Sequence, residues 1–209
     1  MLMSRLQLVP DTAPSGLDNP SWIRRAMLIE QVAEAYADGT FTPTQRRQAE
    51  DLFRTAIYDG EPLVRSVLAD SLKRLAQLPR DIVMSLARDE AQVARPILRT
   101  SPLLGDDDLV RIARDGSRSH RLAIAERDSL SAKVAQALYD TRDPIVLRRL
   151  LANDGAALTE GLLQAILDTL GETSGIVEAV SRRRLLPVSV LTRLAHFGAG
   201  EIAHDYAVA

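Results

Sequence analysis

The chain has 209 residues, 46% of them hydrophobic and 4% aromatic, and its 26 basic and 28 acidic side chains leave a net charge of −2. The hydrophobic share excludes a wholly disordered chain, and the near-neutral charge argues against a general binder of nucleic acid or anionic membranes, although a basic patch on one face stays open. Because cysteine is absent, disulfides, thiol nucleophiles and thiolate metal sites are excluded as well.

The two ends of the chain have the composition of loose segments. Residues 1–19 combine prolines, serine and glycine with polar residues, so we expect a flexible leader there. This leader lacks the long apolar core of a signal peptide, and no run in the chain approaches the roughly 18 apolar residues of a membrane span. We therefore expect a cytoplasmic protein that ends in a tail over residues 199–209.

Residues 20–60 are predicted to form a pair of helices that caps the rest of the fold. Asn19 is suited to cap the first helix, and Gly39 is suited to terminate it. Thr42 and Gln45 stand in the positions of a capping box at the start of the second helix. The first helix also carries an apolar stripe at helical spacing. Its members are Trp22, Ala26, Ile29, Ala33 and Tyr36.

From residue 61 to residue 198 the pattern changes to five segments, each predicted to hold two short helices. Pairs of residues four apart recur about every 26 to 30 residues along these segments. The pairs are Val64/Leu68, Val93/Ile97, His120/Ile124, Val146/Leu150 and Ile176/Val180. The second helices repeat too, with SLARD at 85–89 and RIARD at 111–115. One short helix pair cannot bury its apolar stripe alone, so this period predicts a stack of pairs.

The sequence therefore predicts an all-α protein, a right-handed α-solenoid of about twelve helices. The period is shorter than the roughly 40–47 residues of ordinary HEAT or armadillo units, and the consensus residues of tetratricopeptide and ankyrin repeats are absent. The expected fold is a HEAT-like, ARM-type superhelix built from pairs of short helices.

Residues 93–154 contain the sequence motifs VARPILRTSPLL, LVRIAR, HRLAIAERDSLS and VLRRLLAND. In these motifs the chain resembles an uncharacterised bacterial family, a domain of unknown function whose members are HEAT-like helical repeat proteins. The resemblance implies the helical-repeat fold. It implies no reaction, cofactor or catalytic residue.

His120 is the first candidate for a catalytic residue. It follows Ser119, but a hydrolase would also need a nucleophile on a strained turn and an oxyanion hole. The repeat places His120 where Val64 and Val93 stand, so the favoured interpretation is partly buried packing with a ring nitrogen bonded to a backbone or carboxylate partner. A pH-dependent packing role is our hypothesis for this residue.

Two acidic stretches are weaker candidates for metal binding. GDDDLV at 105–110 lacks the spacing of an EF-hand, and we expect Asp106 to cap a helix with Asp107 and Asp108 in its first turn. Glu201 and His204 have the E-x-x-H spacing once, whereas a diiron bundle needs it twice. We predict neither a metal nor any other cofactor.

The arginines are the strongest candidates for binding. Arg88 and Arg114 occupy the same repeat position, and Arg65 and Arg121 correspond in the first helices. Corresponding residues of a solenoid align on one face, so these side chains can form a basic strip. The competing interpretation is a set of solvated ion pairs. The carboxylates available for such pairs are Asp70, Asp89, Asp115 and Glu126.

The predicted function is that of a non-enzymatic scaffold or adaptor, which binds another protein or a second copy of itself through the concave face of the array. Exposed residues of the second helices are expected to make the contacts, together with Arg121. These second-helix residues are Arg88, Arg111, Arg114 and Tyr139. The alternative is a nucleic-acid-binding repeat protein with an arginine-lined groove, which the neutral charge and low aromatic content disfavour.

Overall fold

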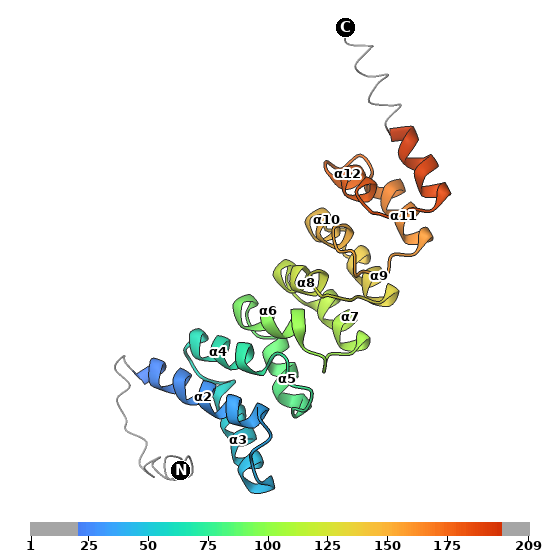
Figure 1. Ribbon diagram of the computed structural model, residues 1–209. Coiled ribbons are helices and arrows are strands. Elements are labelled where there is room, and N and C mark those ends of the chain that lie inside the picture. The colour runs from blue at the N-terminus through green and yellow to red at the C-terminus, as the bar shows by residue number, and fades with distance from the viewer. Residues whose placement is uncertain (1–20, 198–209) are drawn as a thin grey trace.

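The computed structural model describes residues 21–197, and this part of the chain is all-helical (Figure 1). The helices are α2 Ser21–Ala37, α3 Pro43–Ala56, α4 Pro62–Leu72, α5 Arg80–Ala87, α6 Ala91–Thr100, α7 Asp106–Asp115, α8 Arg118–Ala125, α9 Ala132–Asp140, α10 Pro144–Leu151, α11 Glu160–Leu170 and α12 Ile176–Ser181. A further helical segment covers residues 188–197. Within these limits there is no strand beyond an isolated bridge between Leu130 and Ala156. No described helix combines the length and the apolar character needed to cross a bilayer.

The expected leader over residues 1–19, the cap at Asn19 and the tail over residues 199–209 lie outside the described residues. Inside them, each segment predicted between residues 61 and 198 contains two helical stretches. They are α4 with α5, α6 with α7, α8 with α9, α10 with α11, and α12 with residues 188–197. The helices α2 and α3 have 17 and 14 residues, and α4 to α12 are shorter.

Caps and prolines determine where many of these helices begin. The predicted capping box is present at α3, where the Thr42 backbone N–H donates to Gln45 at 2.7 Å and Pro43 occupies the first turn. Asp143 caps α10 in front of another proline, and Ser131 and Thr159 cap α9 and α11. Each cap supplies an acceptor for a backbone N–H that has no partner inside its own helix.

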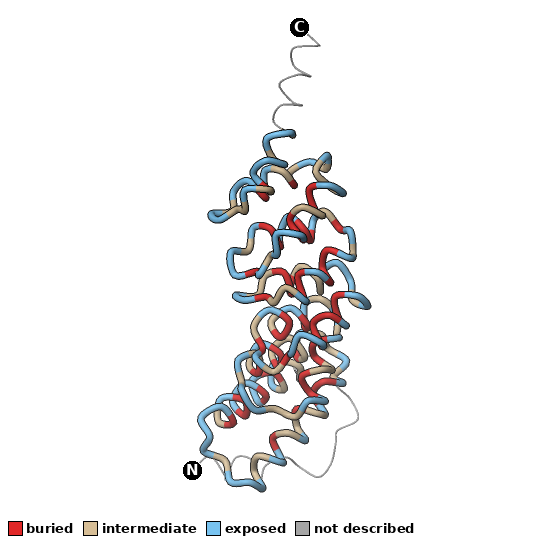
Figure 2. The backbone as a smooth tube through the Cα atoms, turned by 90° about the vertical axis from the view of Figure 1, so that its right-hand side faces the viewer, coloured by how far each residue is buried: buried red, intermediate tan, exposed pale blue. Residues whose placement is uncertain are grey.

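The helices stack in two rows that run side by side along the molecule (Figure 1). In the first row α2, α4, α6, α8, α10 and α12 contact one another in succession, and in the second row α7 contacts α9. One continuous apolar core, from Ile29 to Val190, fills the space between the rows. Figure 2 shows the buried residues following the length of the array, with exposed backbone on its outer sides. Of the residues in the five predicted pairs, all except His120 are buried.

Three side chains tie the end of one first-row helix to the next. We name them the link residues, and each lies two positions beyond the last residue of its helix: Arg127 after α8, Asn153 after α10 and Arg183 after α12. Arg127 donates to the carbonyl oxygens of Leu98 and Ser101, at the end of α6. The other two bond backward in the same way. Asn153 donates to Ala125 and Arg127, and Arg183 donates to Leu151, Asn153 and Ala156. Carbonyls that the helices leave without a partner are thereby satisfied by the following helix pair.

Candidate partner-binding surfaces

Two of the predicted binding residues meet in one pocket. Arg88 follows the last residue of α5, Arg111 lies in α7, and both line a cavity of about 330 Å³ with His120 and Asp115. Arg114 is exposed on the same helix as Arg111 but does not line the cavity. Both cavity arginines are exposed as well.

These arginines do not form the ion pairs that the competing interpretation required. Among residues 21–197, no ion pair joins Arg88, Arg111 or Arg114 to a carboxylate. Three of the four carboxylates considered as partners are bonded to other side chains. Asp70 pairs with Lys73, Asp89 pairs with Arg65, and Glu126 pairs with Arg95, Arg99 and Arg149. The ion-pair interpretation therefore holds for Arg65 and for the later Arg149, but not for Arg88 or Arg114, and the guanidinium groups of the cavity stay available to other acceptors.

His120 is half-buried at the third position of α8, the position that valine occupies in α4, α6 and α10. Its Nε2 lies 2.9 Å from the carbonyl oxygen of Asp89, and its Nδ1 lies 2.7 Å from the hydroxyl of Ser117. Because a carbonyl only accepts, Nε2 carries the hydrogen of this bond. The prediction of partly buried packing with a ring nitrogen bonded to backbone is confirmed. Ser119 is exposed and forms no part of this network.

Arg121 has a different environment from the one expected. It corresponds in position to Arg65, but its Nε donates to the carbonyl oxygen of Ala113 at 2.7 Å and its Nη2 donates to that of Arg114 at 3.3 Å. These carbonyls belong to the last turn of α7, where a cation is favoured by the helix dipole. Arg121 therefore supports the helix that carries Arg111.

Tyr139 does not lie on an exposed face, and its prediction as an exposed contact residue was wrong. The residue is 5% exposed, and its hydroxyl lies 3.2 Å from both the carbonyl oxygen of Ala165 and the hydroxyl of Thr169 in α11. The guanidinium of Arg142 stacks over the ring, with its Cζ 4.1 Å from the ring centroid. A tyrosine can be buried in this way once its hydroxyl finds a partner.

The acidic stretch at the start of α7 is used for helix capping and for contacts between helices. Gly105, and not Asp106, is the cap of α7, because Asp106 already belongs to the helix. Asp108 is buried, accepts from the Gly105 backbone N–H at 3.3 Å and pairs with Arg80. Lys133 and the more distant Arg111 hold the pKa of Asp107 below its ordinary value. Within residues 21–197 no three histidine, aspartate or glutamate side chains cluster as metal ligands, and Glu201 and His204 lie outside the described residues.

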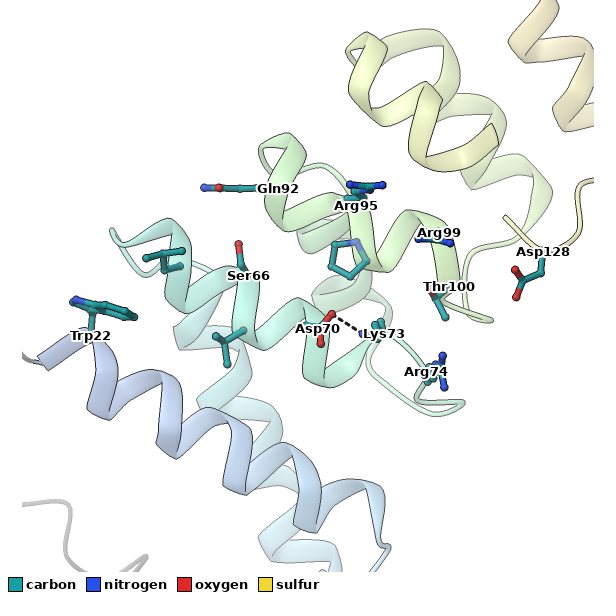
Figure 3. Close-up of a pocket in the computed structure, with 13 residues that line it drawn as sticks. Trp22, Ser66, Asp70, Lys73, Arg74, Gln92, Arg95, Arg99, Thr100 and Asp128 are labelled. Atoms are coloured by element: carbon teal, nitrogen blue, oxygen red, sulfur yellow. Dashed lines mark hydrogen bonds and ion pairs between the residues drawn. The ribbon is translucent and has the colours of Figure 1, made fainter. Parts of the chain in front are cut away.

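A larger groove crosses the first row of helices, and no sequence pattern indicated it. Figure 3 shows residues of α2, α4 and α6 around this cavity of about 760 Å³. Apolar side chains from each of these helices line it, together with basic ones. The apolar residues are Trp22, Leu63, Val67 and Pro96, and the basic residues are Lys73, Arg74, Arg95 and Arg99.

Beside this groove, three arginines share one carboxylate. Glu126 follows the last residue of α8 and has only 14% of its side chain exposed. Arg95 approaches it at 3.1 Å, Arg149 at 3.3 Å and Arg99 at 3.9 Å. The cluster joins α6, α8 and α10 and has two more positive than negative charges. The spacing of Arg95 and Arg99, four apart on one helix face, was a sequence signal for it.

The comparison with curated proteins found no match, and neither did the comparison with solved structures. The family model described as "Uncharacterised protein conserved in bacteria (DUF2336)" matches residues 93–205. Because this match covers more than half of the chain, the protein belongs to that bacterial family.

Proposed function

We propose that this chain is a non-enzymatic scaffold, a HEAT-like α-solenoid that binds a protein partner on the surface of its helix array. The succession of contacts along the first row and the single core support the solenoid. The link residues support it further, because they join the pairs that begin with α8, α10 and α12 to the pair before each of them. A rigid stack of this kind offers extended surfaces suited to recognition.

One observation carries the proposed binding role: Arg88 and Arg111 share a pocket, and no ion pair within residues 21–197 occupies either of them. A guanidinium binds carboxylates through two parallel hydrogen bonds, so these groups suit acidic side chains of a partner. Arg114 extends the surface, and Arg121 holds the end of α7 behind it. The nucleic-acid alternative has less support, because Asp115 lines the same pocket and the net charge is −2.

Affinity capture from the native cell, read by mass spectrometry, tests this proposal. The bait proteins are the tagged wild type, the double variant Arg88→Glu/Arg114→Glu, and a matched control, Arg47→Glu/Arg184→Glu, which reverses two exposed arginines elsewhere on the array. We expect a protein that the wild type and the control capture and the double variant loses. That protein, purified, should bind the wild type directly after nuclease treatment. An identical set of captured proteins for all three baits, or capture that nuclease abolishes, would contradict the proposal.

A further inference from the structure

The groove on the first row is longer than its main cavity. The cavity of about 760 Å³ across α2, α4 and α6 shares Gln92 and Arg95 with a second cavity of about 360 Å³ between α6 and α8. The second cavity is also lined by Glu126, the carboxylate of the three-arginine cluster. The two cavities therefore adjoin along α6, and we call them together the recess. Trp22 of α2 lines its first part, and the arginine cluster of α6, α8 and α10 lies at its second part.

The two ends of this recess differ in chemistry. Around Trp22 the walls are apolar, and Leu63 leaves 47% of its surface exposed there. In Figure 3, Trp22 lies at one side, while Arg95 and Arg99 project from α6 at the other. Exposed apolar side chains inside a recess favour contact with apolar groups of a partner.

The charged end has more cations than its own carboxylates balance. Lys73 is paired with Asp70, but Arg74 is exposed and, within residues 21–197, takes part in no ion pair. Arg95 and Arg99 share the single carboxylate of Glu126 with Arg149. One carboxylate cannot satisfy three guanidinium groups, each of which has five N–H donors. Asp128 lines the cavity near these arginines and offsets only part of the charge.

We propose that this recess binds an acidic segment of a partner protein, with an apolar side chain against Trp22 and Leu63 and carboxylates on Arg74, Arg95 and Arg99. Charge complementarity identifies the occupant as acidic, and the apolar wall identifies it as a peptide with side chains of both kinds. Glu126 is then an internal competitor, which holds the arginines in place when the recess is empty. The cations of this recess belong to α6 and to the end of α4, whereas Arg88 follows α5 and Arg111 lies in α7, so the two sites share no arginine and can be tested separately.

Selection from a random peptide library on the intact purified protein tests the inference without a known partner. We expect enriched peptides that combine clustered Asp or Glu with an apolar residue. Their affinity should fall about tenfold or more in Arg95→Gln/Arg99→Gln and a few-fold in Arg74→Glu, which breaks no described ion pair. It should rise about threefold in Glu126→Gln, because the competing carboxylate is gone. Arg47→Gln is the control that should bind as the wild type does. Enriched peptides that lose affinity in Arg88→Glu/Arg111→Glu instead of in the recess variants would belong to the pocket of the proposed function and count against the inference.

Several results would overturn the inference. They are the absence of enriched peptides, enrichment of peptides without acidic residues, and equal binding by Arg74→Glu and the wild type. Weaker binding after Glu126→Gln also contradicts it, because an ion pair with a purely structural role would be lost in that variant. A labelled single-stranded oligonucleotide that displaces the peptides and itself depends on Arg74 would assign the recess to nucleic acid instead. Thermal unfolding of each variant separates loss of binding from loss of fold, and Arg74→Glu keeps the test valid if Arg95→Gln/Arg99→Gln does not fold.

Discussion

The guanidinium of Arg127 lies 2.7 Å from the carbonyl oxygen of Leu98, a residue 29 positions earlier in the chain. The same group donates to Ser101 at 2.9 Å, so one side chain serves two carbonyls at the end of α6. Burial lowers the pKa of Arg127, yet an arginine in a protein stays charged. A half-buried cation is tolerated here because its donors have fixed acceptors.

Replacing Arg127 by leucine should therefore lower the free energy of unfolding by about 2 to 3 kcal/mol, since both carbonyls lose a charged donor. Arg127→Lys should recover only part of this loss, because an ammonium cannot reproduce the planar fork of a guanidinium. Urea denaturation measures both variants. The control Arg47→Leu, at an exposed position, should change stability by no more than about 0.5 kcal/mol. An Arg127→Leu variant as stable as this control would show that the bonds to α6 are unimportant.

Gly155 marks a close approach between two connecting segments. A Cβ at this position would lie 1.9 Å from the carbonyl oxygen of Asp128, while Leu130 donates to the Gly155 carbonyl at 3.1 Å. Gly155→Ala should destabilise the fold by roughly 2 to 4 kcal/mol, because a backbone segment must move. Gly161→Ala in α11 meets nothing within 4 Å and should gain about 0.5 to 1 kcal/mol from helix propensity. Chemical denaturation of the two variants should show effects of opposite sign.

Asp143 gives the stability a defined dependence on pH. Burial by itself would raise the pKa of Asp143, but Arg118 and the backbone N–H groups of Ile145 and Val146 outweigh it, and the net pKa lies below the ordinary 3.8. The carboxylate therefore stabilises the fold above the unfolded-state pKa, and this contribution is lost as the pH falls through the lower folded-state pKa.

The variant Asp143→Asn should accordingly be less stable than the wild type at pH 7 by about 0.5 to 1 kcal/mol, a modest value because Arg118 is mostly exposed. The difference should shrink below pH 3.8 and vanish once the wild-type carboxyl is protonated. Denaturation curves at several pH values measure it. Asp154→Asn, which changes an exposed carboxylate, should follow the wild type throughout. A deficit of Asp143→Asn that persists at the lowest pH would contradict this assignment.

His120→Val tests whether the histidine does more than fill its position. Packing alone predicts equal or higher stability, since valine occupies the equivalent positions of α4, α6 and α10. The bond from Nε2 to the Asp89 carbonyl predicts instead a loss of about 1 kcal/mol. Ser117→Ala removes only the partner of Nδ1 and should cost less, because a solvent molecule can replace that hydroxyl. Thermal unfolding of both variants distinguishes the two interpretations.

The helix pairs could be predicted from the sequence because their signals are local. Thr42 and Gln45 form the expected capping box, and Val93 and Ile97 are buried as their four-residue spacing indicated. Such patterns depend on neighbouring positions of one helix, whose geometry is the same in every protein. The change of helix length after α3 was visible for the same reason.

The surface could be predicted less well, because it depends on contacts between helix pairs. Tyr139 shares a repeat position with Arg114, but its hydroxyl bonds to Thr169, which lies 30 positions later, and Arg142 stacks over its ring. Glu126 is approached by arginines from two other helices, one before it and one after it. Repeat position alone therefore predicts which residues correspond, but not whether a neighbouring pair covers them.

The link residues give the array a direction. Each reaches back toward the amino terminus, so the helix pairs that begin with α6, α8 and α10 are each completed by the pair that follows. Removing the last pair would take away Arg183 and leave the carbonyls of Leu151, Asn153 and Ala156 without this donor, while removing the first pair would break no such bond. During synthesis the amino-terminal part of the chain leaves the ribosome first. The carbonyls at the ends of α6, α8 and α10 would therefore gain these donors only after the following helix pair has been made.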